Sequence, residues 1–230
     1  ALAVSHVDFR TGYRADLAAL REVLGPDRLL IVDAVQSIGV VDDDYALADV
    51  LVGHGYKWLR AGRGTGFARF SDFARERIAP VLSGSTGTTA EGLFLDELPD
   101  PAASARAYTV SRVDPLAAAR LAVGLRAVDE AGVGAIEERL AAQVDGILEI
   151  ADRHRIEVTS PRAPSRRAGI VTLAPSEPGR VAAALANAGV VVTARGGSVR
   201  IAPHAGTDAE TVRMLDEALA GSGNEMFISA

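Results

Sequence analysis

A chain of 230 residues is long for one compact domain and sufficient for two small ones. Its 48% apolar and 23% charged residues fit a globular protein with a core, and a net charge of −6 argues against a nucleic-acid partner. The lack of cysteine excludes disulfides and thiolate catalysis, and we expect no metal site. No apolar run could cross a membrane and the first residues do not resemble a signal peptide, so we expect a cytoplasmic protein.

The first half of the chain alternates helical and strand patterns, which predicts an α/β fold with a mostly parallel sheet. Leucine spacing predicts a helix over 14–24, ended by the turn residues Gly25-Pro26-Asp27. The continuous apolar run 29–32 predicts a strand buried on both faces, as in parallel sheets. Shorter strands are expected at 49–52 and 66–70.

The second half begins with a segment at 80–107 that has turn residues and little periodicity, which predicts a long loop. Two long helices are expected at 116–130 and 135–153, the second with an apolar stripe. From residue 156 onward, short elements in the order β-β-α-β-β-α, the first of them a strand at 156–160 (IEVTS), predict a small sheet with helices on one side. We therefore divide the chain into domains 1–114 and 115–230.

Lys57 is the only lysine of the chain, because 23 of the 24 basic residues are arginine. It follows the predicted strand 49–52, where α/β sheets place their ligand crevices. A primary amine can condense with an aldehyde, whereas a guanidinium cannot. A surface lysine is the simple alternative, but the neighbours His54, Tyr56 and Trp58 favour a site.

Asp33 directly follows the buried strand 29–32 in the sequence IVDAVQSIG. Its carboxylate could cap a helix, or it could lie in the same crevice as Lys57 and keep a basic ring nitrogen protonated. The pattern alone favours neither interpretation. Gln36 can reach the crevice as a neutral donor, so the two segments together predict one site.

The sequence DAVQSIG, followed by GYKWL and GTGF, resembles the class V branch of pyridoxal 5'-phosphate (PLP) enzymes of aminotransferase fold type I. This branch includes cysteine desulfurases, kynureninases and isopenicillin N epimerases. VSHVDFRTGYRADLAAL and GVVVTARGGSVRIAPHAGTDAETVRMLDEAL resemble two further parts of the family. The resemblance implies that 1–114 is the C-terminal portion of the PLP-binding large domain and that 115–230 comprises long helices and a small C-terminal α/β domain. It also implies an amino-acid substrate and a homodimer.

The resemblance assigns a role to each matching residue. Lys57 would form a Schiff base with PLP and act as base and acid at the substrate α-carbon. Asp33 would pair with the pyridinium nitrogen, and Gln36 would donate to the phenolic oxygen. The remaining matches are Tyr56 and His54 on the phosphate side, Asp8 near the ring oxygen, and Arg200 with Arg195 at the substrate carboxylate. Without the resemblance, both arginines would be ordinary exposed residues of an edge strand.

Three departures from the family pattern limit what the resemblance implies. Relatives carry a further N-terminal stretch, so we expect this chain to be a fragment. They also place a glycine-threonine pair near 108–112, where none is found in register. Because a cysteine desulfurase needs a thiolate to accept sulfur, we expect an aminotransferase, epimerase or lyase instead. The alternative is a non-catalytic scaffold or regulatory protein with the same fold; a nicotinamide enzyme is disfavoured because no glycine fingerprint follows a strand.

Overall fold

The structure is a computed structural model that describes residues 1–90 and 97–223. Residues 91–96 of the predicted loop 80–107 therefore lie outside the described residues. The chain forms two compact units, each considered by itself below. The first unit contains Ala1–His6, Asp16–Ile38 and Asp43–Ala127, and the second contains Val7–Ala15, Gly39–Asp42 and Val128–Ala230.

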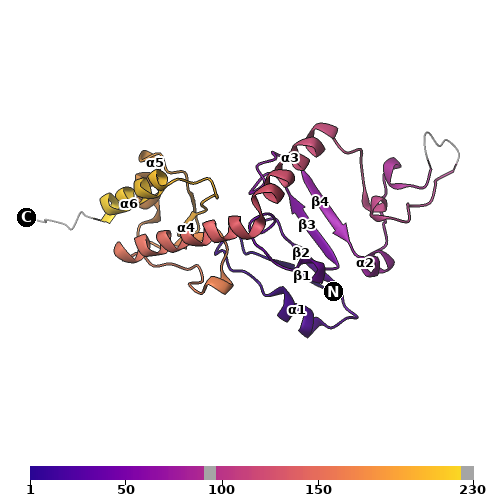
Figure 1. The fold of residues 1–230 in the computed structure, drawn as a ribbon, viewed down its shortest axis with the longest axis horizontal. Helices are drawn as coiled ribbons and strands as arrows, with labels where there is room; N and C mark the ends of the chain where they lie inside the picture. Colours follow the sequence, from indigo (N-terminus) through magenta and orange to yellow (C-terminus); the bar gives the residue numbers. More distant parts are fainter. Residues whose placement is uncertain (91–96, 224–230) are drawn as a thin grey trace, which may run out of the picture. The chain divides into compact units, whose positions relative to one another are not determined.

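The first unit is built on a sheet which, in the described residues, has four strands in the order β1-β2-β3-β4 (Figure 1). β1 to β3 run parallel, and β4 runs antiparallel to β3. This mostly parallel sheet confirms the expected α/β class, and the three predicted strands are present with small shifts at their ends. The strands are β1 (Leu2–Ser5), β2 (Leu30–Asp33), β3 (Val50–His54) and β4 (Gly66–Phe70).

Strand β2 and helix α1 (Leu17–Leu24) share one buried cluster in the first unit. Leu30 and Val32 alternate along β2 and are fully buried together with Leu17. The predicted helix start at residue 14 was wrong. Asp16 adopts an extended backbone and accepts a hydrogen bond from the Ala19 N–H at 2.9 Å, which places the cap after residue 14.

Short helices and turns complete the first unit. These are η1 (Tyr45–Leu47), α2 (Asp72–Arg77), η2 (Ser85–Gly87) and η3 (Ala105–Tyr108), and the unit ends within α3 (Pro115–Ala131). α3 confirms the predicted helix 116–130. Tyr108 stacks on Phe70 with ring centroids 4.1 Å apart and donates to the Ile78 carbonyl at 2.7 Å. The start of the unusual segment 108–112 is thus a packing element of this unit.

The second unit combines the long helix α4 (Val133–Arg153) with a small antiparallel sheet in the order β5-β7-β6. Its other elements are η4 (Pro164–Arg166), β5 (Val171–Leu173), α5 (Pro178–Asn187), β6 (Thr193–Arg195), β7 (Ser198–Ile201) and α6 (Ala209–Gly223). The predicted strand at 156–160 was wrong, since only Val158 forms a bridge, to Leu173. The hydroxyl of Ser160, rather than a backbone carbonyl, accepts the Thr172 N–H and interrupts the ladder.

The core of the second unit contains the predicted apolar stripe of α4, with Val144 and Ile147 almost fully buried beside Leu185 and Val199. Helices α5 and α6 lie side by side (Figure 1). Where α4 ends, His154 pairs with Asp216 of α6 at 2.7 Å, and the hydrogen bond from His154 lowers the pKa of the Asp216 carboxyl. Within the described ranges, no helix has the length and apolar character needed to span a membrane.

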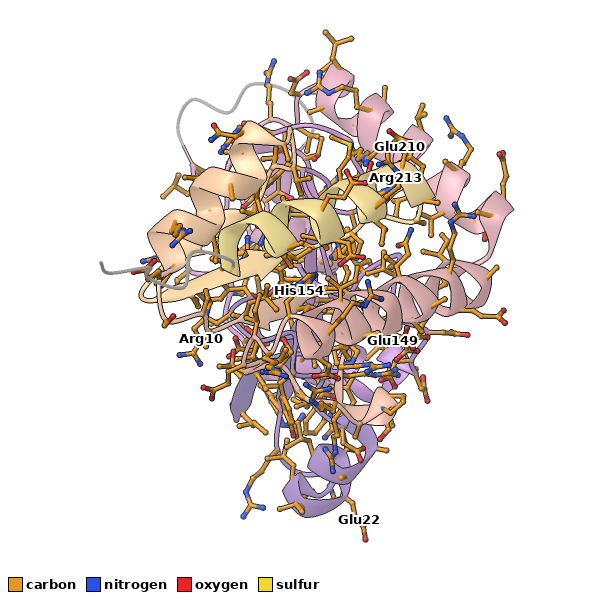
Figure 2. The ribbon with its side chains drawn as sticks, turned by 90° about the vertical axis from the view of Figure 1, so that its left-hand side faces the viewer. Arg10, Glu22, Glu149, His154, Glu210 and Arg213 are labelled. Carbon is orange, nitrogen blue, oxygen red and sulfur yellow. The ribbon has the colours of Figure 1, made fainter. Side chains whose placement is uncertain are left out.

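Solvent-facing side chains of the second unit form local ion pairs on single helices. Figure 2 shows Glu210 and Arg213 together on α6, where their side chains are 2.7 Å apart. Glu217, one turn further along, pairs with the same guanidinium. Exposed i,i+3 and i,i+4 pairs of this kind are screened by water and contribute little to stability, so the buried cluster rather than these pairs holds the unit together.

Candidate cofactor site

The candidate site lies at the carboxyl ends of the parallel strands in the first unit. Asp33 is the last residue of β2 and His54 the last residue of β3. Asp33 is in register with Val52 of β3, so the segments that follow these two strands leave the sheet as neighbours. Crevices outside the carboxyl ends of strands are where α/β sheets bind ligands, which makes this edge the natural place to examine the predicted residues.

A hydrogen bond joins the segment after β2 to the segment after β3. The indole Nε1 of Trp58 donates to the backbone carbonyl of Gln36 at 2.8 Å. Within the first segment, the Asp33 carboxylate accepts the Val35 N–H at 2.9 Å. Asp33 therefore shapes the turn after its strand, but residues 35–40 form turns rather than a helix that it could cap, and Gln36 is buried. The structure thus brings Asp33, Gln36 and the Lys57 segment to one edge of the sheet.

The turn that carries Lys57 is closed by backbone hydrogen bonds of Gly55. Its N–H donates to Thr65 at 3.2 Å and its carbonyl accepts from Ala61 at 2.7 Å. A Cβ at position 55 would lie only 2.5 Å from the Thr65 Oγ1 and 2.7 Å from the Ala61 Cβ. Only glycine leaves room for this approach. Lys57, two residues later, is half-buried.

His54 and Tyr56 stack face to face beside Lys57. Their ring centroids are 3.8 Å apart with planes inclined by 11°, and Tyr56 remains 45% exposed. The Lys57 ammonium lies 6.0 Å from the Tyr56 centroid. The His54 Nδ1 is buried and has no hydrogen-bond partner among the described residues. Buried polar atoms normally have partners, so this nitrogen marks a place where a ligand could bind.

Acid is expected to destabilise the fold through His54. Burial, and next the Lys57 charge, lower the pKa of His54 below its usual 6.5, although the Asp33 charge opposes them. As the pH falls from 6.5 towards the lowered value, the unfolded chain binds a proton that the folded chain does not, so the free energy of unfolding decreases. Urea unfolding of the protein and of His54→Gln should show a weaker pH dependence for the variant in this range. Identical pH profiles would contradict the assignment.

Asp8, Arg195 and Arg200 belong to the second unit and are described within it. Asp8 pairs with Arg10 at 2.8 Å, and this side-chain hydrogen bond lowers the pKa of its carboxyl. An ionised carboxylate accepts but cannot donate. Arg195 is exposed on β6. Arg200 of β7 donates to the Phe9 carbonyl at 2.8 Å, while its buried Nε has no hydrogen-bond partner among the described residues.

Sequence reasoning overlooked a polar cluster behind the site. His6, directly after β1, is fully buried and lies within hydrogen-bond distance of Ser37, Asp43 and Tyr45. The only signal in the sequence was a histidine next to an apolar strand, which is equally typical of a core residue. Its partners are 31 to 39 residues away along the chain, and no local pattern predicts them.

Solved structures share this fold. A cysteine desulfurase from Thermococcus onnurineus NA1 matches with a TM-score of 0.85 at 24% identity, over 96% of this chain and 59% of that one. The cystine C-S lyase C-DES, in complex with its reaction product cysteine persulfide, matches with a TM-score of 0.82 at 21% identity. The match covers 95% of this chain and 60% of that one. An alanine–glyoxylate aminotransferase from Nostoc sp. matches with a TM-score of 0.72 at 20% identity, and the match covers 96% of this chain and 61% of that one. No protein-family profile and no curated protein matches the sequence.

These similarities confirm the fold expected from the resemblance. The chain has the α/β fold of class V enzymes of aminotransferase fold type I, and it spans 59% to 61% of the length of the three matched chains. Another C-DES structure contains glycine covalently linked to its PLP cofactor. Identities at or below 24% establish a shared fold, whereas activity and ligands have to be argued from this chain's own residues.

Proposed function

We propose that the chain belongs to a PLP-dependent enzyme that acts on an α-amino acid. The observation that carries the proposal is the position of the only lysine, in the turn after β3, beside the carboxylate that ends β2. Both segments leave the carboxyl edge of the sheet and are joined through Trp58 and Gln36. The shared fold with PLP enzymes gives this arrangement its chemical interpretation.

The residues present at this edge fit the groups of PLP. The aldehyde requires an amine, which Lys57 supplies, and the basic ring nitrogen requires a carboxylate, which Asp33 supplies. The phosphate requires donors, and the buried, unpartnered Nδ1 of His54 and the hydroxyl of Tyr56 are both available on the side of Lys57. Gln36 would bind the phenolic oxygen. Each role needs one residue of the correct type, and each is found.

Bound PLP supplies an electron-withdrawing ring that accepts the electron pair left when a bond at the substrate α-carbon breaks. Lys57 would hold the cofactor covalently and then move a proton at that carbon. The negative charge of Asp33 would keep the ring nitrogen protonated. Arg200, with Arg195, is proposed to bind the substrate carboxylate, since a guanidinium matches its two oxygens.

The reaction we propose is a transamination, an epimerisation or a lyase cleavage. A cysteine desulfurase transfers sulfur to a thiolate of its own, and none of the 230 residues is a cysteine. This chain therefore lacks the sulfur acceptor, although one structure of the same fold is a cysteine desulfurase. A C-S lyase needs no such residue, so that chemistry stays within the proposal.

We also propose that the protein is a homodimer. Five large apolar side chains of the first unit are 66% to 83% exposed, and exposed apolar surface of this kind favours association. They are Val81, Leu82, Val110, Val113 and Leu116. Light scattering coupled to gel filtration would measure the mass directly, and a monomer at every concentration would contradict the proposal.

Borohydride trapping tests the proposed function. The chain is incubated with PLP, reduced, digested and mapped, and the only amines that can react are Lys57 and the N-terminus. The proposal predicts a reduced adduct on Lys57. An adduct on the N-terminal amine alone, or none, would overturn it and favour a non-catalytic scaffold with the same fold.

Removing the charge of Asp33 is expected to weaken PLP binding about 10–100-fold, because a hydrogen bond to a charged group contributes roughly 1.5–3 kcal/mol. Asp33→Asn keeps an oxygen for the Val35 N–H, so the local turn should persist. Titration of the protein with PLP, followed by absorbance, measures the dissociation constant. Asp16→Asn is the matched control, since asparagine caps α1 about as well as aspartate. Equal affinity in the two variants would contradict the role of Asp33.

A further inference from the structure

His6 is a fully buried histidine whose two ring nitrogens both have polar neighbours in the first unit. Its Nε2 lies 3.1 Å from the Asp43 carboxylate. Its Nδ1 lies 3.0 Å from the Ser37 hydroxyl and 3.2 Å from the Tyr45 hydroxyl. The Tyr45 ring also meets the imidazole edge to face, with centroids 5.4 Å apart. Burying such a cluster of polar groups costs free energy unless its members form hydrogen bonds with each other.

The chemistry of the neighbours fixes which nitrogen carries the proton. An ionised carboxylate only accepts, so Nε2 must donate to Asp43. In the neutral ring, Nδ1 is then an acceptor, and its single lone pair accepts from a hydroxyl facing it. Asp43 thereby sets the tautomer that lets His6 bind Ser37. Asparagine at position 43 would remove the charge that selects this tautomer.

His6 binds both ends of the segment that carries Asp33. Its backbone N–H donates to the Asp33 carbonyl at 2.9 Å, and its ring contacts the Ser37 hydroxyl. Between these points, the N–H groups of Ser37 and Ile38 both donate to the Ala34 carbonyl, at 2.9 and 2.8 Å. The turn 33–38 is therefore held from one side by His6, and Trp58 binds its Gln36 carbonyl.

We propose that His6 and Asp43 form a positioning pair, which holds the segment 33–38 so that the Asp33 carboxylate meets the ring nitrogen of bound PLP. This inference rests on the proposed function. Neither residue of the pair touches the cofactor, and both act through Ser37 and the Asp33 backbone. A histidine that merely filled the core would stabilise the fold without affecting the cofactor.

The test compares Asp43→Asn with Asp216→Asn, which disrupts a second histidine–carboxylate pair, that of His154. In Asp43→Asn, amide hydrogen exchange in 33–38 should be about tenfold faster, as expected for a turn that has lost one fixed hydrogen bond. The dissociation constant of PLP should rise about tenfold, and the absorbance spectrum of bound PLP should shift. Asp216→Asn should alter neither quantity, although it lowers stability.

Ser37→Ala provides a second variant, because it removes the hydroxyl that lies 3.0 Å from the His6 ring and also 3.3 Å from the Ala34 carbonyl within the turn. It should change the amide hydrogen exchange of 33–38 and the absorbance spectrum of bound PLP in the same direction as Asp43→Asn does. Unchanged amide hydrogen exchange in 33–38 in these two variants would overturn the proposed positioning role of His6 and Asp43. Faster exchange with an unaltered absorbance spectrum and affinity of PLP would overturn it as well. If the unmodified chain retains no PLP, the proposed function fails and the pair positions nothing; the trapping experiment identifies that case.

Discussion

Replacement of Lys57 by arginine is expected to abolish covalent retention of PLP while leaving the chain folded. Arginine keeps the positive charge of this half-buried side chain and its contact with the Tyr56 ring, but a guanidinium does not condense with an aldehyde. Because the chain has no other lysine, the variant retains only the N-terminal amine. Mass spectrometry after borohydride reduction should find no PLP adduct on the internal peptides, whereas the parent chain carries one.

A double variant separates the position of the amine from its mere presence. Lys57→Arg combined with Arg126→Lys restores one lysine on an exposed site of α3, in the same unit. It should remain without a stable adduct, because position 126 offers neither the stacked pair of His54 and Tyr56 nor the Asp33 carboxylate. Equal labelling of the double variant and the parent would show that PLP reacts with any accessible lysine, and the site would be refuted.

Substitution of Gly55 by alanine is expected to lower the free energy of unfolding by about 1–3 kcal/mol, the usual cost of overpacking. The added methyl group would lie 2.5 Å from the Thr65 Oγ1 and 3.0 Å from the Leu121 Cδ1, too close without movement of the turn. Since Lys57 lies in this turn, its yield of trapped adduct should fall as well. Urea unfolding measures the first effect, and borohydride trapping measures the second.

Gly146→Ala is the matched control for the substitution at position 55. Gly146 lies within α4, and a Cβ there meets no atom within 4 Å. Because glycine is about 1 kcal/mol less favourable than alanine inside a helix, this variant should be slightly more stable and should trap PLP as the parent does. If both glycine variants gave the same unfolding curve, the crowding inferred around Gly55 would be wrong.

Local patterns were sufficient to predict most of the elements. The strand 66–70 follows from a short apolar segment and the helix α4 from an apolar stripe, both of which depend only on neighbouring residues. The start of α1 was misplaced, because a single hydrogen bond from the Ala19 N–H to the Asp16 carboxylate decides it. The strand expected at 156–160 is absent because the Ser160 hydroxyl takes the place of a backbone acceptor. Nothing in GFARF indicates that β4 runs antiparallel.

The candidate site was predictable where it depends on chain order and unpredictable where it depends on distant contacts. Asp33 and Lys57 each follow a strand, and parallel neighbours bring such positions to one edge. The stacking of His54 on Tyr56 follows from the side-chain directions within a short turn, which the sequence does not specify. The bonds of His6 to Ser37 and Asp43 join segments far apart in the chain, and only the folded sheet brings them together.

The second unit is assembled from three separate stretches of chain, two of which are short loops placed between segments of the first unit. Glu137 of α4 accepts from the Arg14 guanidinium and from the Asp42 backbone N–H, both at 2.8 Å, and so holds the two loops. A cut after residue 127 would therefore leave both loops without Glu137 and leave Glu137 without these two donors. The two units are interleaved and not modular: recombination or truncation cannot exchange one for a homologous unit at a single junction, and a working hybrid would need matched segments at several points of the gene.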